Sequence, residues 1–226
     1  MSETSTGSLA ERLERVTAEV NDAARAADRD PAGITTIVVT KFHPASLVRE
    51  LAGLGVRHVG ENRHQDAGPK AAQLTDLDLE WHFVGQLQSK KARQVVDYAR
   101  VIHSIDRASL VRALDGSNVD TFIQLNLTDD PARGGVQPGE LESLAEAVLA
   151  TSTLRLVGVM AVAPLGEQPR SAFARVREAS ERLQTLAPEA NKLSMGMSQD
   201  FREAIAEGAT HLRIGTAITG NRPTSP

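Results

Sequence analysis

The sequence predicts a single closed (β/α)8 barrel preceded by one N-terminal helix, and three observations support this prediction. About eight short runs rich in β-branched residues follow one another along the chain. Stretches with helical periodicity, about 10–15 residues long, lie between them, which is typical of parallel βαβ units. The chain has 226 residues, close to the roughly 250 that such a barrel takes. We therefore expect one α/β domain over residues 1–226.

The N-terminal helix is predicted from a repeat of apolar residues. Leu9, Leu13, Val16 and Val20 recur at helical spacing, with charged residues between them. Pro31 ends this pattern. We expect the polar ends of the chain, about residues 1–8 and 223–226, to be frayed.

Strands and helices then alternate along the rest of the chain. The runs expected to form strands are 34–40, 56–60, 81–84, 100–103, 119–127, 154–162, 192–195 and 210–214. The amphipathic stretches expected to form helices are 45–54, 89–99, 138–150 and 171–186. An open doubly wound sheet is the alternative, but that fold usually has a glycine-rich turn after its first strand. Here the first strand runs into Thr40, Lys41 and Phe42 without a glycine, which favours the barrel.

The composition excludes several classes of function. Lys and Arg number 25 and Asp and Glu 29, so the net charge is −4, without the basic footprint of a protein that binds nucleic acid or anionic lipid. The chain has no cysteine, which excludes disulfides, thiolate catalysis and cysteine-ligated metals. The six histidines show no HExxH motif or other paired ligand spacing, so we expect no metal site.

The N-terminal residues do not have the basic and then apolar layout of a signal peptide. No apolar run approaches the roughly 20 residues that span a bilayer. We therefore predict a cytoplasmic protein with neither a membrane nor a nucleic acid as its partner.

The candidate site follows from the strand ends, because barrel enzymes carry their functional residues at the C-terminal ends of the strands. Lys41 directly follows the first predicted strand. A lysine amine crowded by apolar walls or cations loses its proton more readily, and the neutral amine attacks carbonyl groups. The alternative is an ordinary surface lysine at the end of a strand.

Small and polar residues follow the seventh and eighth predicted strands, at 194–198 and 213–216. Barrel phosphate sites recur in the loops after these two strands, together with a helix N-terminus. We therefore expect an anion cradle, with Ser198 opening the helix that follows. The alternative is a plain N-cap serine, and Asp200 in the first turn favours that alternative because it already complements the helix dipole.

Two further polar residues rank below these. Asn62 follows the second strand, and His82 lies within the third. Either side chain can hydrogen-bond or stack over a planar ligand, although a lone histidine on a strand is more often a satisfied core residue. The turn-forming run 129–135 is expected to be a solvated loop, with a mobile lid as the alternative.

Six ordered motifs resemble one known family over nearly the whole chain. They are VVTKFHP (38–44), HVGENR (58–63), WHFVGQLQSKK (81–91), LVGVMAV (156–162), LSMGMSQDFREAI (193–205) and HLRIGTAITGNR (211–222). Together they resemble the pyridoxal phosphate homeostasis family, also called the YggS/PROSC family. The resemblance implies a fold type III barrel like the N-terminal domain of alanine racemase.

The resemblance also implies a cofactor, pyridoxal 5′-phosphate (PLP), held as a Schiff base on Lys41. The arginine of the RIGT motif, here Arg213, would face the pyridine nitrogen, and the asparagine of the GEN motif, here Asn62, would line the ring pocket. The phosphate would lie against the SMGMS and RIGT segments, here at Ser194, Ser198, Gly215 and Thr216. The sequence departs from the family at Thr40, where serine is common, at 86–90, at 218–220 and in the loop 128–135.

These residues favour a carrier of PLP over an efficient enzyme. A cation such as Arg213 beside the pyridine nitrogen opposes the protonated ring that carbanion chemistry needs. Racemisation also needs an acid and a base on opposite faces of the substrate, and the only tyrosine, Tyr98, is expected at the far end of the barrel. We therefore predict a monomer that buffers PLP and delivers it to PLP-dependent apo-enzymes. The alternatives are a weak amino-acid racemase or other PLP enzyme, and a class I aldolase-like barrel in which Lys41 attacks a sugar-phosphate carbonyl.

Overall fold

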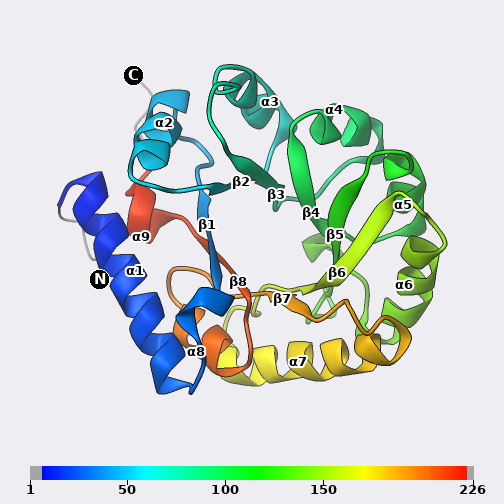
Figure 1. The fold of residues 1–226 in the computed structure, drawn as a ribbon. Coiled ribbons are helices and arrows are strands. Elements are labelled where there is room, and N and C mark those ends of the chain that lie inside the picture. The colour runs from blue at the N-terminus through cyan, green and yellow to red at the C-terminus, as the bar shows by residue number, and fades with distance from the viewer. Residues whose placement is uncertain (1–6, 223–226) are drawn as a thin grey trace.

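Eight parallel strands, each hydrogen-bonded to the next and the last to the first, close into a barrel (Figure 1). This computed structural model describes residues 7–222. The strands are β1 (Thr35–Val39), β2 (His58–Glu61), β3 (Glu80–Phe83), β4 (Ala99–Ile105), β5 (Val119–Gln124), β6 (Leu154–Met160), β7 (Lys192–Ser194) and β8 (His211–Ile214). The predicted barrel is confirmed, and all eight predicted runs contain a strand.

Helices surround the barrel on its outside (Figure 1). They are α1 (Leu9–Ala26), α2 (Ala45–Gly53), α3 (His64–Ala72), α4 (Ala92–Val96), α5 (Ala108–Leu114), α6 (Leu141–Leu149), α7 (Pro169–Leu186), α8 (Phe201–Ala206) and α9 (Thr216–Thr219). The helix predicted over 89–99 is too long at both ends. A 3₁₀ turn (Ser89–Lys91) comes first, and Ala99 already pairs with Trp81 as the first residue of β4.

The N-terminal helix is ordered from its cap onward. The side chain of Ser8 accepts a hydrogen bond from the Glu11 backbone, and the Glu11 carboxylate accepts one from the Ser8 backbone at 2.7 Å. This reciprocal cap satisfies donors that a helix start leaves free, so the prediction that residue 8 is frayed is wrong. Residues 1–6 and 223–226, which were also predicted to be frayed, lie outside the described residues. The buried face of α1 packs against α8 and α9.

Two separate groups of side chains fill the fold, because successive residues of a strand point to opposite sides. The larger group lies between the strands and the surrounding helices and is apolar. The side chains inside the barrel are more polar. His103 of β4 stacks on Phe122 of β5 and contacts His211 of β8, so these three rings meet across the interior. A polar interior is one that can position functional groups.

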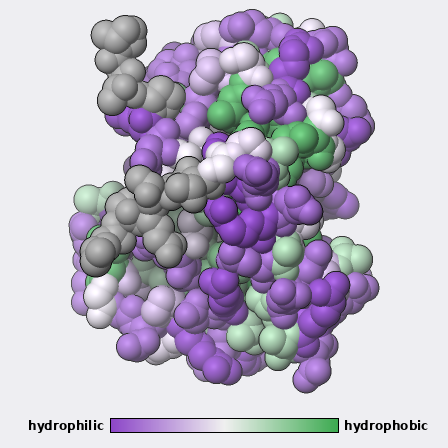
Figure 2. Space-filling view, turned by 90° about the vertical axis from the view of Figure 1, so that its left-hand side faces the viewer, coloured by the Kyte–Doolittle hydropathy of each residue, from purple (hydrophilic) through white to green (hydrophobic). Residues whose placement is uncertain are grey.

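The surface is mainly hydrophilic on the face shown in Figure 2, and its most strongly hydrophobic area lies in the upper part of that view. Within residues 7–222, no helix has the length and apolar character that a membrane crossing requires. The barrel has two openings, one at the N-terminal ends of the strands and one at the C-terminal ends. Barrel enzymes carry their functional residues at the C-terminal ends.

Candidate functional site

Lys41 lies two residues beyond the end of β1, on the same side of the chain as the barrel interior. The side chains of Ile37 and Val39 face that interior, where an added Cβ at Gly60 would lie 3.0 and 3.3 Å from them. Alternation then places Lys41 at the C-terminal opening. Its side chain is exposed, with Nζ 5.8 Å from the centroid of the Phe42 ring, and no salt bridge joins it to any residue within 7–222. Lys41 therefore follows β1 at the opening where the sequence predicted it, and its role there stays a prediction.

On the outer side of the C-terminal ends of β1 and β2, facing α3, three polar side chains are buried: Thr40, Glu61 and Lys70. We call this the closed side. The hydroxyl of Thr40 donates to Oε1 of Glu61 at 2.8 Å. Lys70 of α3 donates to the same carboxylate oxygen and, at 2.9 Å, to the carbonyl oxygen of Thr40. Sequence reasoning missed this cluster, because nothing in the spacing showed that a helix lysine would reach a strand glutamate. The cluster fixes the backbone from which Lys41 projects.

Asn62 follows β2 and offers an acceptor that the protein does not use. Its Oδ1 is buried and has no hydrogen-bond partner among the described residues. The segment after β3 packs closely on this residue, since a Cβ added at Gly85 would lie 2.2 Å from the Asn62 carbonyl oxygen. A buried acceptor without a donor costs free energy, and a bound ligand that donates a hydrogen bond would remove that cost. The ligand-facing role of Asn62 stays a prediction.

Arg213 of β8 is a buried guanidinium held in a fixed position. Nη1 donates to the carbonyl oxygen and the hydroxyl of Ser194 at 2.6 and 2.7 Å, and Nη2 donates to the carbonyl oxygen of Ala161 at 2.8 Å. Nε has no acceptor among residues 7–222 and stays available to a ligand. Burial lowers the pKa of Arg213 to about 10, so the group is a cation at neutral pH.

The structure separates Ser194 from the other residues predicted to hold a phosphate. Its hydroxyl lies inside the barrel, 2.8 Å from Nδ1 of His103, and accepts the hydrogen bond from Arg213. The side chain therefore already has two partners and positions the guanidinium. The sequence predicted that the Ser194 hydroxyl would contact the phosphate directly. The hydrogen bonds of this hydroxyl to His103 and Arg213 disfavour that contact.

The loops after β7 and β8 do meet, as predicted for the anion cradle. The backbone N–H of Ala217 lies 3.5 Å from the hydroxyl oxygen of Ser198, which joins the two loops. Within the described part of the chain, the backbone N–H groups of Ser198, Gln199 and Thr216 have no protein acceptor. Gly215 precedes Thr216 at the N-terminus of α9. Free N–H groups converging from two loops form a suitable site for an anion.

Asp200, which counted against an anion site in the sequence, uses its carboxylate in a hydrogen bond within the loop after β7. Its carboxylate accepts from the backbone N–H of Met197 at 2.6 Å, and burial is the main cause that raises its pKa. Asp200, rather than Ser198, is the N-cap of α8. The interpretation of Ser198 as a plain helix cap is therefore wrong, because its hydroxyl faces the α9 loop instead.

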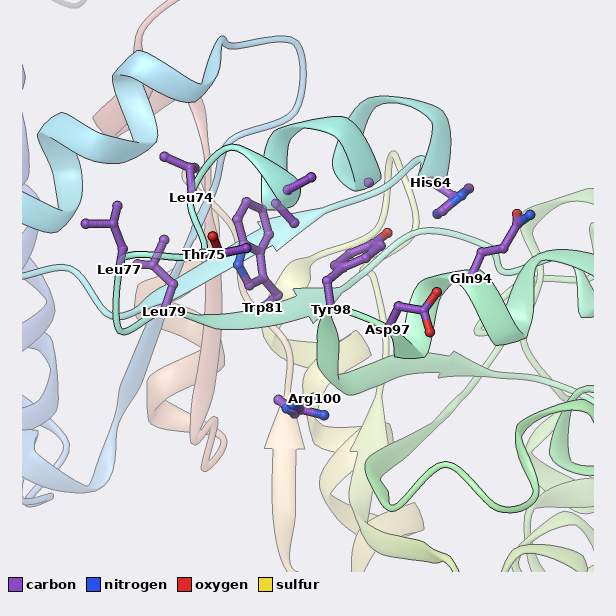
Figure 3. A pocket seen from close by; sticks show the side chains of 13 residues that line it. His64, Leu74, Thr75, Leu77, Leu79, Trp81, Gln94, Asp97, Tyr98 and Arg100 are labelled. Atoms are coloured by element: carbon purple, nitrogen blue, oxygen red, sulfur yellow. The ribbon is translucent and has the colours of Figure 1, made fainter.

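His82 and Tyr98 lie away from the C-terminal opening. Nδ1 of His82 is 2.9 Å from Nε2 of His103 inside the barrel, so His82 lies away from the predicted ring pocket and contacts another histidine there. Tyr98 immediately precedes β4, at the N-terminal end of the barrel, as predicted. Figure 3 shows it beside Trp81 and facing His64 in a pocket of about 550 Å³ on the outer wall. Burial raises the pKa of Tyr98.

The loop 128–135 is held by Asn126, which follows β5. Nδ2 of Asn126 donates to the carbonyl oxygen of Asp130 at 2.9 Å, and Oδ1 accepts from the backbone of Thr128 at the same distance. A backbone bridge joins Leu125 to Val136 behind the loop. These contacts, in a loop whose residues 129, 130, 132 and 133 are exposed, match the predicted solvated loop better than the alternative of a mobile lid.

Comparisons with known proteins identify the family. The family model described as "Alanine racemase, N-terminal domain" matches residues 12–223. The pyridoxal phosphate homeostasis protein of Pseudomonas aeruginosa is 41% identical over 223 residues, which cover 95% of this chain and 96% of that protein. The chain belongs to the pyridoxal phosphate homeostasis family.

Solved structures agree with this assignment. PipY of Synechococcus elongatus is 37% identical, and the match covers 94% of this chain and 100% of that one. The TM-score is 0.85 for PipY without PLP and 0.82 for PipY with PLP bound. Alanine racemase of Corynebacterium glutamicum shares the fold, at a TM-score of 0.70 and 17% identity, and the match covers 94% of this chain and 62% of the racemase.

Proposed function

We propose that the protein binds PLP as a Schiff base on Lys41 and takes part in cytoplasmic PLP homeostasis, buffering the cofactor and delivering it to apo-enzymes. One observation carries this proposal. At one barrel opening, a lysine amine without an ion pair and several backbone N–H groups without an acceptor, as judged within residues 7–222, occur together. The first group suits an aldehyde and the second suits a phosphate. PLP carries both, and PipY, a relative at 37% identity, has been solved with PLP bound.

The residues of the C-terminal opening fit this cofactor. Lys41 would form the covalent bond, and Asn62 and Arg213 would face the ring with an unused acceptor and an unused Nε donor. Ser198, Gly215 and Thr216 would hold the phosphate. Ser194 would orient Arg213 through their hydrogen bond and would not contact the phosphate directly.

The same residues argue for a carrier. When bound, PLP supplies a reactive aldehyde and a pyridine ring that can act as an electron sink. A cation near the ring nitrogen disfavours the protonated ring, which is the better electron sink. Arg213 is buried, held by three hydrogen bonds and, with a pKa of about 10, still charged. Tyr98, the one tyrosine of the sequence, lies at the N-terminal end of the barrel. It is too far from the C-terminal opening to act there as the second acid that racemisation needs.

A weak amino-acid racemase is the second candidate, because the matching family model describes the N-terminal domain of alanine racemase. The chain matches 62% of the length of one such racemase, so the remainder of that enzyme has no counterpart in the match. An aldolase-like barrel is disfavoured by the same family assignment. We propose that the carrier acts as a monomer.

Two measurements test the proposed function. The purified protein, incubated with PLP and then desalted, is expected to keep a visible absorbance that a Lys41→Ala variant lacks. Prolonged incubation of the loaded protein with D- and L-alanine, followed by chiral chromatography, is expected to show no interconversion above the Lys41→Ala background. A colourless wild-type protein would contradict PLP binding, and rapid interconversion would favour the racemase.

A further inference from the structure

Three potential metal ligands meet at the other opening of the barrel, where the strands begin. His58 is the first residue of β2, Glu80 is the first residue of β3, and His82 lies two residues further along β3. The register of the two strands pairs His58 with Glu80 and Gly60 with His82. The three side chains therefore share one face of two hydrogen-bonded strands. We propose that His58, Glu80 and His82 bind a zinc ion at the N-terminal opening.

The distances between the three ligand atoms fit a zinc ion. Nδ1 of His58 lies 3.1 Å from Nε2 of His82 and 3.4 Å from Oε1 of Glu80. Nε2 of His82 lies 3.3 Å from the same oxygen. Zinc bonds to histidine and carboxylate at about 2.0–2.1 Å, so two ligands of a tetrahedral zinc ion are about 3.3–3.4 Å apart. An octahedral ion with the same bond lengths would bring them to about 2.9 Å. Both distances to Glu80 match the tetrahedral value, and the 3.1 Å between the two histidines lies between the two values.

Hydrogen bonding alone explains these distances less well. A charge-assisted hydrogen bond between an imidazole and a carboxylate is about 2.7–2.9 Å long. Both histidine contacts to Glu80 are longer than that, at 3.4 and 3.3 Å, and the two ring nitrogens also face each other at 3.1 Å. Three donor atoms arranged around one point, each at a ligand–ligand separation from the other two, match a shared ion.

The surroundings of the three residues support the same conclusion. A zinc-bound histidine almost always uses its second ring nitrogen in a hydrogen bond that fixes the ring. His82 does so through Nδ1, 2.9 Å from Nε2 of His103, and His103 in turn lies 2.8 Å from the Ser194 hydroxyl. The strands hold the backbones of all three ligands, which is the rigid support that a metal site requires.

The fourth ligand of the ion would be water. The side chains of His58 and Glu80 are 36% and 45% exposed, so solvent reaches the cluster from the N-terminal opening. Asp120, the neighbouring carboxylate on β5, is taken by Arg155, whose Nε donates to it at 2.6 Å and whose Nη2 contacts its second oxygen. Two histidines, one glutamate and an open position form a ligand set that zinc uses in proteins.

The sequence analysis predicted no metal site, because it searched for ligands at short spacings along the chain. The two histidines are separated by 24 positions and lie on different strands, so no short motif marks them. Only the register of β2 against β3 brings them together.

Zinc binding to the untagged full-length chain tests the proposal. After removal of metals by a chelator and desalting, titration calorimetry is expected to show one Zn²⁺ per chain. His58→Ala and Glu80→Gln are each expected to weaken that binding at least about tenfold, since each removes one of three ligands. Both residues are partly exposed, so circular dichroism is expected to show an unchanged fold.

Matched variants and a second metal make the test specific. His64→Ala removes a histidine on α3 outside the cluster and is expected to leave the zinc affinity unchanged. Lys41→Ala is expected to leave it unchanged as well, so that failure of the zinc proposal and failure of PLP binding can be told apart. Co²⁺ in the same site is expected to give the intense visible absorbance of a four-coordinate ion. No zinc binding by the wild-type protein, or wild-type zinc affinity in His58→Ala and Glu80→Gln, would overturn the proposal.

Discussion

Two lysines lie on opposite sides of the end of β1, and within the described residues only one of them forms an ion pair. Lys70 is 6% exposed and donates hydrogen bonds to Glu61 and to the carbonyl oxygen of Thr40. Lys41 follows Thr40 directly in the sequence, but its amine is exposed at the barrel opening and forms no ion pair with residues 7–222. The alternation of a strand sends neighbouring residues into these two different environments.

The difference separates a lysine that stabilises the fold from one that is free for chemistry. A buried charge has to be paired, because an unpaired one is costly, so Lys70 and Glu61 depend on each other. An exposed lysine contributes little to stability. Substitutions on the closed side are therefore expected to change the free energy of unfolding, and those on the open side to change ligand binding.

The largest expected effect is on the open side. Lys41→Ala is expected to abolish the visible absorbance of the PLP-loaded protein completely, because no other amine is placed at this opening in the proposal. The free energy of unfolding is expected to change by less than about 0.5 kcal/mol, as for most surface substitutions. Absorbance spectra and urea denaturation measure the two effects, with Lys90→Ala, another exposed lysine, as the control that keeps its colour.

The largest effect on the closed side is expected from Lys70→Met. This change leaves the Glu61 carboxylate buried without its cation, which costs about 3–5 kcal/mol in comparable cases. Urea denaturation checks the loss. The double variant Lys70→Met/Glu61→Gln removes both charges and is expected to recover part of the stability. If the single variant were as stable as the wild type, the contrast between the two lysines would be wrong.

A smaller effect is expected in the anion cradle. Ser198→Ala combined with Thr216→Ala removes two hydroxyls beside the free backbone N–H groups. Hydrogen bonds to charged groups contribute about 1.5–3 kcal/mol each, so we expect PLP to bind at least about tenfold more weakly. Pyridoxal, which has no phosphate, is expected to bind as before. Equilibrium dialysis compares the two ligands, with Ser171→Ala as a control, and equal losses for both would contradict the cradle.

The smallest expected effect at neutral pH is a change in stability that comes from the barrel interior and grows as the pH falls. Burial lowers the pKa of His211 from 6.5 to about 3. The unfolded chain therefore binds a proton that the folded protein does not, and stability falls as the pH drops from about 6.5 towards 3. The slope from one such group is about 1.4 kcal/mol per pH unit. His211→Gln is expected to flatten the stability curve by up to that amount, and an unchanged slope would show that His211 is not kept neutral.

The sequence was sufficient to predict the barrel and the position of Lys41, because both depend on local periodicity and on the rule that functional residues follow strand ends. It was not sufficient for α3, whose interior contains Gly68 and Pro69. It also did not show that Asp200, rather than Ser198, occupies the N-cap position of α8, because that position depends on how the loop is folded. The Lys70–Glu61 pair and the His58–Glu80–His82 cluster depend on contacts between separate elements, which no local pattern encodes.

Borohydride reduction of the PLP-loaded protein, followed by peptide mass mapping, tests the central claim most directly. Reduction makes the bond between PLP and its amine permanent, so the modified peptide identifies the lysine. We expect a single modified site at Lys41, with Lys70, Lys90 and the other lysines unmodified. A pyridoxyl group on a different lysine, or no modification of a protein that retains PLP, would contradict the account.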